Sequence, residues 1–219
     1  MGTSVFTKYP SDCKFGGMRV LNVGCGHAKF SAKNVVNVDL ETIAEPDVQW
    51  DLSKAPYPFQ DETFDLVIAN HILEHVPNWW VAFEECSRVL KTGGVFEIWL
   101  PGDGTSSQLG YRDHINVINE CSFMGIHAFY RNPGNAWATA NGNGISTRMK
   151  AIRKDRMMNE KLWWIRWAPD SLKHWMAEHL RNVIVEDGFK FRKLPPEPIG
   201  NTERDEKVKK LTLFAGASK

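Results

Sequence analysis

Two glycines and one aspartate stand at the ends of two neighbouring apolar runs near the start of this sequence. The run Met18–Val23 ends at Gly24 and Gly26, and the run Val35–Val38 ends at Asp39. A glycine lacks Cβ, so the backbone can approach a ligand closely there, and a carboxylate can accept hydrogen bonds from two ribose hydroxyls. The spacing predicts a site for a cofactor that carries adenosine. The alternative without a ligand is a tight turn followed by a surface aspartate.

Two adenosine cofactors compete for this pattern. A dinucleotide such as NAD needs a third glycine and a full helix whose N-terminal amides hold the pyrophosphate, with the acid about 20 residues further on. The third glycine is absent here, and residues 28–33 leave room for only one or two turns at about 3.6 residues per turn. S-adenosylmethionine (SAM) has no phosphate and needs only a close turn and a carboxylate. The pattern therefore favours SAM over NAD.

The next sixty residues contain further elements in a distinctive order. After Asp39 come a short strand candidate before Asp51-Leu52, a buried strand ending at Asn70, the segment Leu73-Glu74-His75, a helix running into Arg88–Gly94, and the strand Val95–Leu100. In this order the chain resembles the class I SAM-dependent methyltransferases of the type 11 group, from about Arg19 to Pro101. It is most similar to those encoded beside glycosyltransferases in surface-polysaccharide clusters. The resemblance implies a Rossmann-like α/β fold. Its seven-stranded sheet would be mostly parallel with the last strand antiparallel, and a helical or loop insertion would follow strand 5.

The resemblance also implies contacts to the methionyl half of SAM. Gly24, Cys25 and Gly26 would line this half of the cofactor. Many family members carry an acid where this chain has Asn22. Its amide oxygen can still accept a hydrogen bond, but a charge contribution to the SAM ammonium group is lost. We therefore expect a modest affinity for SAM.

The nucleoside half is assigned by the same resemblance. Asp39 would accept from the ribose hydroxyls, and Leu40 would lie against the adenine face. Asp51 would accept from the adenine amino group, with the Leu52 backbone beside it. Asn70, at the carboxyl end of its strand, would lie near the SAM amino group and sulfonium.

Composition is typical of an ordinary enzyme domain. The chain has 219 residues, 42% of them hydrophobic, and a formal charge of +1. We expect residues 1–219 to form one methyltransferase domain. No apolar run reaches the roughly 18 residues of a spanning helix. The four cysteines lack CxxC spacing, so we expect reduced thiols in a cytoplasmic location, with no disulfide framework, no zinc site and no assigned metal ligand.

Residues 102–168 are predicted to be a substrate-side insertion within the domain. The part up to Gly144 is rich in Gly, Asn and Ser, with a short helix expected over Ser122–Tyr130. Arg148–Trp167 combines seven basic residues with three tryptophans. This stretch fits packing on the domain, peripheral contact with a membrane or lipid-linked substrate, or binding of single-stranded nucleic acid. A net charge near zero disfavours nucleic acid.

Regular structure is predicted again near the C-terminus. Pro169-Asp170-Ser171 is typical of a helix start. Phe189–Leu194 and Leu211–Ala215 are predicted to be the last two strands, joined by a proline-rich, charged loop.

Candidate catalytic residues follow from the need to remove a proton from a hydroxyl acceptor. His114, next to Asp113, is the first candidate base, and His75 is the second. We expect methyl transfer to an oxygen, less readily a nitrogen, of a small or glycan-like acceptor. Two alternatives stay open, namely a methyltransferase fold used only for binding or assembly, and an RNA ribose or cap methyltransferase.

Overall fold

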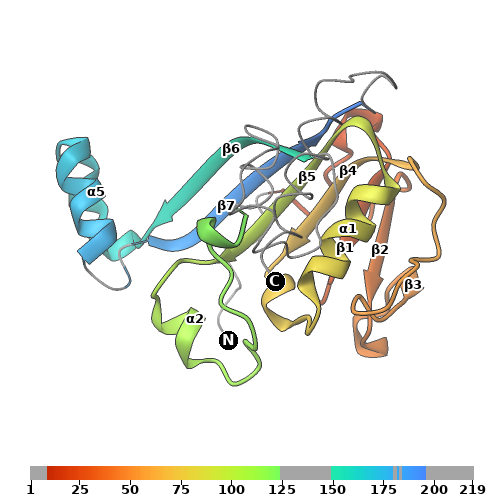
Figure 1. Ribbon diagram of the computed structural model, residues 1–219, viewed down its shortest axis with the longest axis horizontal. Coiled ribbons are helices and arrows are strands. Elements are labelled where there is room, and N and C mark those ends of the chain that lie inside the picture. The colour runs from red at the N-terminus through yellow and green to blue at the C-terminus, as the bar shows by residue number, and fades with distance from the viewer. Residues whose placement is uncertain (1–8, 124–148, 180–181, 183, 196–219) are drawn as a thin grey trace, which may run out of the picture.

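One seven-stranded sheet organises the molecule (Figure 1). The computed structural model describes residues 9–123, 149–179, 182 and 184–195. The strands are β1 (Val20–Val23), β2 (Val35–Asp39), β3 (Val48–Gln49), β4 (Phe64–Asn70), β5 (Leu90–Pro101), β6 (Met149–Met158) and β7 (Ile184–Lys193). Their order across the sheet is β3-β2-β1-β4-β5-β7-β6. Chain order therefore reverses between β1 and β4, which is where ligands bind in open α/β sheets.

Strands β1 to β5 are parallel to one another, and β7 runs antiparallel to both β5 and β6. This confirms the predicted Rossmann-like α/β sheet with an antiparallel last strand. Every residue of β1 is buried, as expected for a central strand that is covered on both faces.

Helices are few in the described chain. They are η1 (Phe15–Gly17), η2 (Thr42–Ala44), η3 (Leu73–His75), α1 (Trp79–Val89), α2 (Ser106–Gly110), η4 (Glu160–Trp167) and α5 (Asp170–His179). Helix α1 covers one face of the sheet, where Phe83 packs against Phe96 and Phe191 (Figure 1). Phe15 and Phe30 pack edge to face in a second core cluster with Val20 of β1 and Ile68 of β4. None of the described helices is long and apolar enough to cross a membrane.

The C-terminal half of the sheet differs from the expectation. Strand β6 lies inside the basic, tryptophan-containing stretch, and Phe189–Leu194 falls almost wholly within β7. The predicted strand Leu211–Ala215 and most of the predicted helix Ser122–Tyr130 lie outside the described residues. Strand β6 was hard to see because its sequence, MKAIRKDRMM, is rich in charge and lacks an apolar run. The expected insertion 102–168 thus includes one strand of the sheet itself.

The chain between β1 and β2 contains no helix at all, although one or two turns were expected there. Side chains hold this loop instead. The Asn37 amide oxygen accepts from the Phe30 amide at 3.1 Å, and its Nδ2 donates to the Phe30 carbonyl at 3.0 Å and to Asp47 at 2.8 Å. Because Asn37 is only 2% exposed, the loop is pinned to the buried middle of β2.

Candidate functional site

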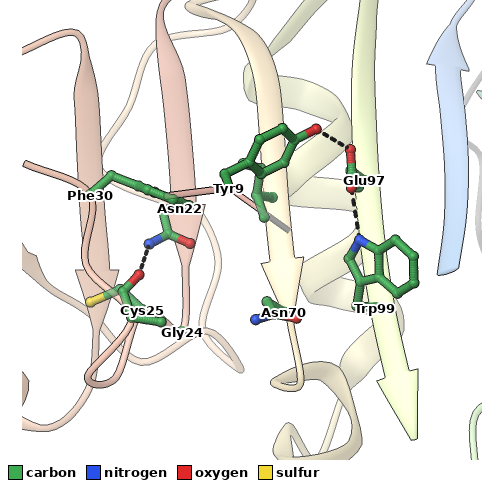
Figure 2. Close-up of a pocket in the computed structure, with 10 residues that line it drawn as sticks. Tyr9, Asn22, Gly24, Cys25, Phe30, Asn70, Glu97 and Trp99 are labelled. Carbon is green, nitrogen blue, oxygen red and sulfur yellow. Dashed lines mark hydrogen bonds between the residues drawn. The ribbon is translucent and has the colours of Figure 1, made fainter. Parts of the chain in front are cut away.

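A pocket opens at the reversal of strand order between β1 and β4 (Figure 2). It lies where the loop after β1 faces the carboxyl end of β4 and the neighbouring strand β5. Its lining residues are Tyr9, Asn22, Gly24, Cys25, Ala28, Phe30, Ile68, Asn70, Glu97 and Trp99. Four residues predicted from the sequence to contact the methionyl half are therefore among them, namely Asn22, Gly24, Cys25 and Asn70.

Asn22 belongs to the hydrogen-bond network of the loop. Its Nδ2 donates to the Asn37 amide oxygen at 3.0 Å and to the Ala28 carbonyl at 3.2 Å. The Asn37 oxygen must be an acceptor because it also takes the Phe30 amide, so Asn22 must present its NH₂ group. An amide therefore performs a structural task at this position that a carboxylate cannot perform.

Gly24 and Gly26 are required for different reasons. Both have positive φ, +63° and +45°. A Cβ on residue 24 would lie 2.1 Å from Cγ1 of Ile72. Residue 24 must therefore be glycine for the turn to pass Ile72, which follows β4. A Cβ on Gly26 would meet nothing within 4 Å. Gly26 therefore faces open space, where a ligand can approach the backbone.

Asp39 lies at the end of β2 and is 9% exposed. Its Oδ2 accepts from the Gly26 amide at 2.8 Å, and its Oδ1 accepts from the Glu41 amide at 2.9 Å. The carboxylate thereby joins the glycine turn to the end of β2. Each of its oxygens can accept a further hydrogen bond, because an ionised carboxylate offers about four acceptor positions.

The other predicted nucleoside contacts lie beside Asp39 rather than among the pocket-lining residues. Leu40 is 54% exposed. The Trp50 amide donates to the Asp39 carbonyl at 2.9 Å, which places Asp51 next to this strand end. Asp51 accepts from the Ser53 amide and hydroxyl, and these hydrogen bonds lower its pKa. Leu52 is buried, and its carbonyl accepts from the Tyr57 hydroxyl.

Six lining residues were not anticipated, and three of them, Tyr9, Glu97 and Trp99, are joined by hydrogen bonds. Glu97 of β5 is 1% exposed and accepts from the Tyr9 hydroxyl at 2.9 Å and from Trp99 Nε1 at 2.7 Å (Figure 2). Lys190 of β7 also donates to it at 2.7 Å. The signal for Glu97 was available, because it is an acid in the middle of an otherwise apolar strand. Burial and the Glu97 charge together raise the pKa of Tyr9, which keeps its phenol protonated as a donor.

An ionic group of one half-buried histidine and two buried carboxylates is joined to two residues that line the pocket. His71 follows Asn70, and its amide donates to the carbonyl of the lining residue Trp99 at 3.0 Å. Its Nε2 lies 3.1 Å from Glu186, and its Nδ1 lies 3.4 Å from Glu74. Burial lowers the pKa of His71, but the two carboxylates outweigh this effect and raise the pKa to about 9. His71 is therefore a cation at neutral pH.

The structure brings the predicted catalytic histidines together. The rings of His75 and His114 lie 4.7 Å apart, edge to face. His75 Nδ1 donates to the Asp113 backbone carbonyl at 2.9 Å, so Asp113 contacts His75 through its main chain. The Ile115 amide donates to the Glu74 carbonyl at 3.1 Å. These contacts fasten the segment after β5 to η3, just past the carboxyl end of β4.

Comparison with known proteins agrees with this architecture. Residues 21–98 match the family described as a methyltransferase domain. A sterol 24-C-methyltransferase of Gibberella zeae is 33% identical over 112 residues, 40% of this chain and 29% of that protein. A cycloartenol-C-24-methyltransferase of Oryza sativa subsp. japonica is 34% identical over 104 residues, 38% of this chain and 30% of that protein. The chain thus aligns with less than a third of the length of these relatives.

The solved structures show the same fold. A SAM-dependent methyltransferase from Archaeoglobus fulgidus superposes with a TM-score of 0.54 at 14% identity, covering 82% of this chain and 88% of that one. The family match identifies residues 21–98 as a methyltransferase domain, and the sheet order with its switch-point pocket gives the described chain the fold of the class I SAM-dependent methyltransferases. The cofactor of this class is SAM.

Proposed function

We propose that this protein transfers the methyl group of SAM to an oxygen of a small or glycan-like acceptor. The observation that carries the proposal is the adjacency of two features at one sheet edge. The glycine turn and Asp39 provide a nucleoside site, and His75 and His114 lie just past β4 on the side where the segment after β5 crosses. A methyl donor and a proton acceptor would then meet at the carboxyl ends of the strands.

The described residues offer groups suited to each part of SAM. Each Asp39 oxygen has accepted one amide hydrogen bond, which leaves capacity for the two ribose hydroxyls. Leu40 offers an uncovered apolar side chain to the adenine, and Asp51 a carboxylate to its amino group. Gly26 leaves room for close approach, and Asn70 would contact the methionyl end.

The transfer itself needs alignment and one proton acceptor. The acceptor oxygen attacks the methyl carbon, the bond from that carbon to sulfur breaks, and its electron pair stays on sulfur to give S-adenosylhomocysteine. The hydroxyl proton would pass to an imidazole nitrogen. His75 is suited to receive it, because Nδ1 carries a proton toward the Asp113 carbonyl and leaves Nε2 as the basic nitrogen.

A second candidate is methylation of a carbon in an apolar acceptor. Both aligned relatives are named as C-24 methyltransferases. Four large apolar side chains in the segment after β5 are more than half exposed, and they are Leu109, Tyr111, Ile115 and Val117. Trp167 is also 80% exposed, which would suit peripheral contact with a membrane or a lipid-linked acceptor. We place this candidate second because the aligned regions cover only 29–30% of those relatives.

The experiment has two stages. Calorimetric titration with S-adenosylhomocysteine tests the cofactor site. Incubation with SAM carrying a ¹³C-labelled methyl group and panels of sugars, sterols and RNA then tests transfer. The ¹³C chemical shift of the product tells a methyl on oxygen from one on nitrogen or carbon. A folded protein that binds no S-adenosylhomocysteine and instead copurifies with a stable partner would sink the enzyme proposal and favour an assembly module.

A further inference from the structure

Three potential metal ligands converge beside the pocket, from η3 and from the segment after β5. One ligand atom from each of Glu74, His75 and His114 lies within 4.8 Å of the others. The carboxylate is 1% exposed, and both histidines are half-buried. None of the three belongs to the lining of the cofactor pocket.

Two of these three side chains have buried polar atoms without a hydrogen-bond partner. Within the described part of the chain, the two carboxylate oxygens of Glu74 accept no hydrogen bond, although Oε1 lies 3.4 Å from His71 Nδ1, and the buried Nδ1 of His114 has no hydrogen-bond partner. Buried polar groups in folded proteins are nearly always hydrogen-bonded, and an exception calls for an explanation such as a bound ion. Here two exceptions face each other in the same cluster.

The charge balance also favours a cation. His71 lies 3.4 Å from Glu74 and 3.1 Å from Glu186, so even a protonated His71 leaves one positive charge facing two carboxylates. Asp187, which follows Glu186 in β7, has a cation of its own, because Arg156 lies 3.5 Å away. A buried carboxylate without a full countercharge is costly, and a divalent cation removes that cost.

We propose that Glu74, His75 and His114 bind one Zn²⁺ ion. Two imidazoles and one carboxylate form a known catalytic zinc ligand set, and imidazole is a poor ligand for Mg²⁺ or Ca²⁺. The Asp113 carbonyl already holds Nδ1–H of His75, which presents Nε2 to the ion. With ligands about 2.0–2.1 Å from zinc, their atoms would lie roughly 3.4 Å apart, so binding needs small side-chain rotations.

A three-ligand zinc site keeps a fourth position for a water or a substrate oxygen. With zinc bound, Nε2 of His75 would be a ligand and could not take the proton, so the ion would instead hold the acceptor oxygen and favour loss of its proton to solvent. This use of the site rests on the proposed function. Metal binding itself does not depend on that function. The cysteine spacing gave no sign of such a site, because its ligands are a glutamate and two histidines from separate segments.

The test measures metal binding directly. Full-length protein is stripped with a chelator, dialysed and titrated with ZnCl₂ by calorimetry, and its Co²⁺ complex is examined by visible absorption. We expect about one ion per chain and a Co²⁺ spectrum typical of a low-coordinate site with nitrogen ligands.

Matched variants locate the site. H75A and H114A should each weaken zinc binding at least about 10–100-fold, because even loss of a second-shell partner has an effect of that size. E74Q tests the carboxylate, and circular dichroism confirms that each variant is folded. The controls are the variants H27A and E62Q. His27 is an exposed histidine in the glycine turn, and Glu62 is an exposed glutamate just before the amino end of β4. Both should bind zinc like the wild type.

Several outcomes would overturn the site. They are no zinc binding by folded wild type, equal losses in H27A and H114A, or binding of Mg²⁺ in preference to Zn²⁺. Titration of the same samples with S-adenosylhomocysteine separates the two proposals. Zinc binding without S-adenosylhomocysteine binding supports the metal site and contradicts the proposed function, whereas the reverse result contradicts the metal site alone.

Discussion

The Asp39 carboxylate accepts a hydrogen bond from the Gly26 amide at 2.8 Å, and so ties the end of β2 to the turn that follows β1. The same carboxylate is the proposed partner of the ribose hydroxyls. On this proposal, cofactor affinity and the shape of the turn depend on one side chain.

Replacement of Asp39 by asparagine should weaken S-adenosylhomocysteine binding by about 10- to 100-fold, because hydrogen bonds to a charged group contribute about 1.5–3 kcal/mol. Calorimetric titration measures the change. D65N is the matched control, since Asp65 pairs with Lys91 at 2.7 Å near the amino end of β4, away from the pocket. Unchanged affinity in D39N would remove Asp39 from the cofactor site.

The two glycines of the turn should respond differently to alanine. Both share the cost of a positive φ, about 1 kcal/mol. Only G24A also forces Ile72 away from a Cβ placed 2.1 Å from it, an overpacking cost of about 1–3 kcal/mol more. Urea unfolding should therefore show G24A as clearly less stable than G26A, while G26A should mainly weaken S-adenosylhomocysteine binding.

A second substitution checks the cause of that difference. I72A removes the side chain that a Cβ on residue 24 would strike, so G24A should destabilise the I72A background less than the wild type. Additive effects of the two substitutions would show that the Ile72 contact is not the reason for glycine at position 24.

Asn22→Asp should lower affinity for S-adenosylhomocysteine rather than raise it. An acid would add charge near the cofactor's ammonium group, but it cannot donate to the Asn37 oxygen or the Ala28 carbonyl. Three acceptors would then face one another in a buried position, at a cost of about 1–3 kcal/mol. Calorimetry and urea unfolding of N22D measure both effects, with N22A as the comparison that removes the donor without adding charge. A gain in affinity without loss of stability would contradict this account.

The Glu85–Arg88 pair should make stability depend on acid pH. Burial raises the pKa of Glu85, but the Arg88 guanidinium at 2.7 Å and the Tyr57 amide outweigh it, so the pKa is lowered overall. A lowered pKa in the folded state stabilises the protein above the unfolded value of about 4.3, and this stabilisation disappears as pH falls through the folded pKa.

E85Q should therefore lose about 1–3 kcal/mol of unfolding free energy at pH 7. The difference from the wild type should shrink as the pH is lowered below the unfolded pKa. Urea unfolding over a pH series measures it. The control is E41Q, at an exposed position. Its unfolding free energy should change with pH in parallel with that of the wild type. A difference between E85Q and wild type that stays constant with pH would contradict the assignment.

The first half of the fold was predictable because its signals are local. The apolar strand ending at Gly24, the strand ending at Asp39 and the long apolar strand before Asn70 each identify themselves by composition. Strand β6 could not be found this way, since its place in the sheet comes from pairing with β7 and not from an apolar pattern. The prediction of a helix after β1 was wrong for a related reason. The side chain of Asn37, from β2, makes the hydrogen bonds to the Phe30 amide and carbonyl that a helix would otherwise make.

The candidate site shows the same division. Gly26 and Asp39 were predicted individually, and the structure adds the hydrogen bond between them. His75 and His114 were named as separate candidate bases. Their approach to Glu74 depends on how the chain after β5 returns to η3, which sequence spacing alone does not encode. Cofactor-side roles thus follow from short motifs, whereas acceptor-side groupings follow from the path of the chain.

The backbone of His71 has a positive φ of +50°, a conformation that glycine adopts more easily than histidine. A glycine there would relax the main chain, yet it would leave Glu186 and Glu74 without their shared cation. Histidine at this position therefore adopts a less favourable backbone conformation but supplies the cation that lies between the two carboxylates. A stabilisation design that considered only the dihedral angles would replace His71 by glycine. That substitution would remove the ion pairs with Glu74 and Glu186 next to the pocket-lining residue Asn70.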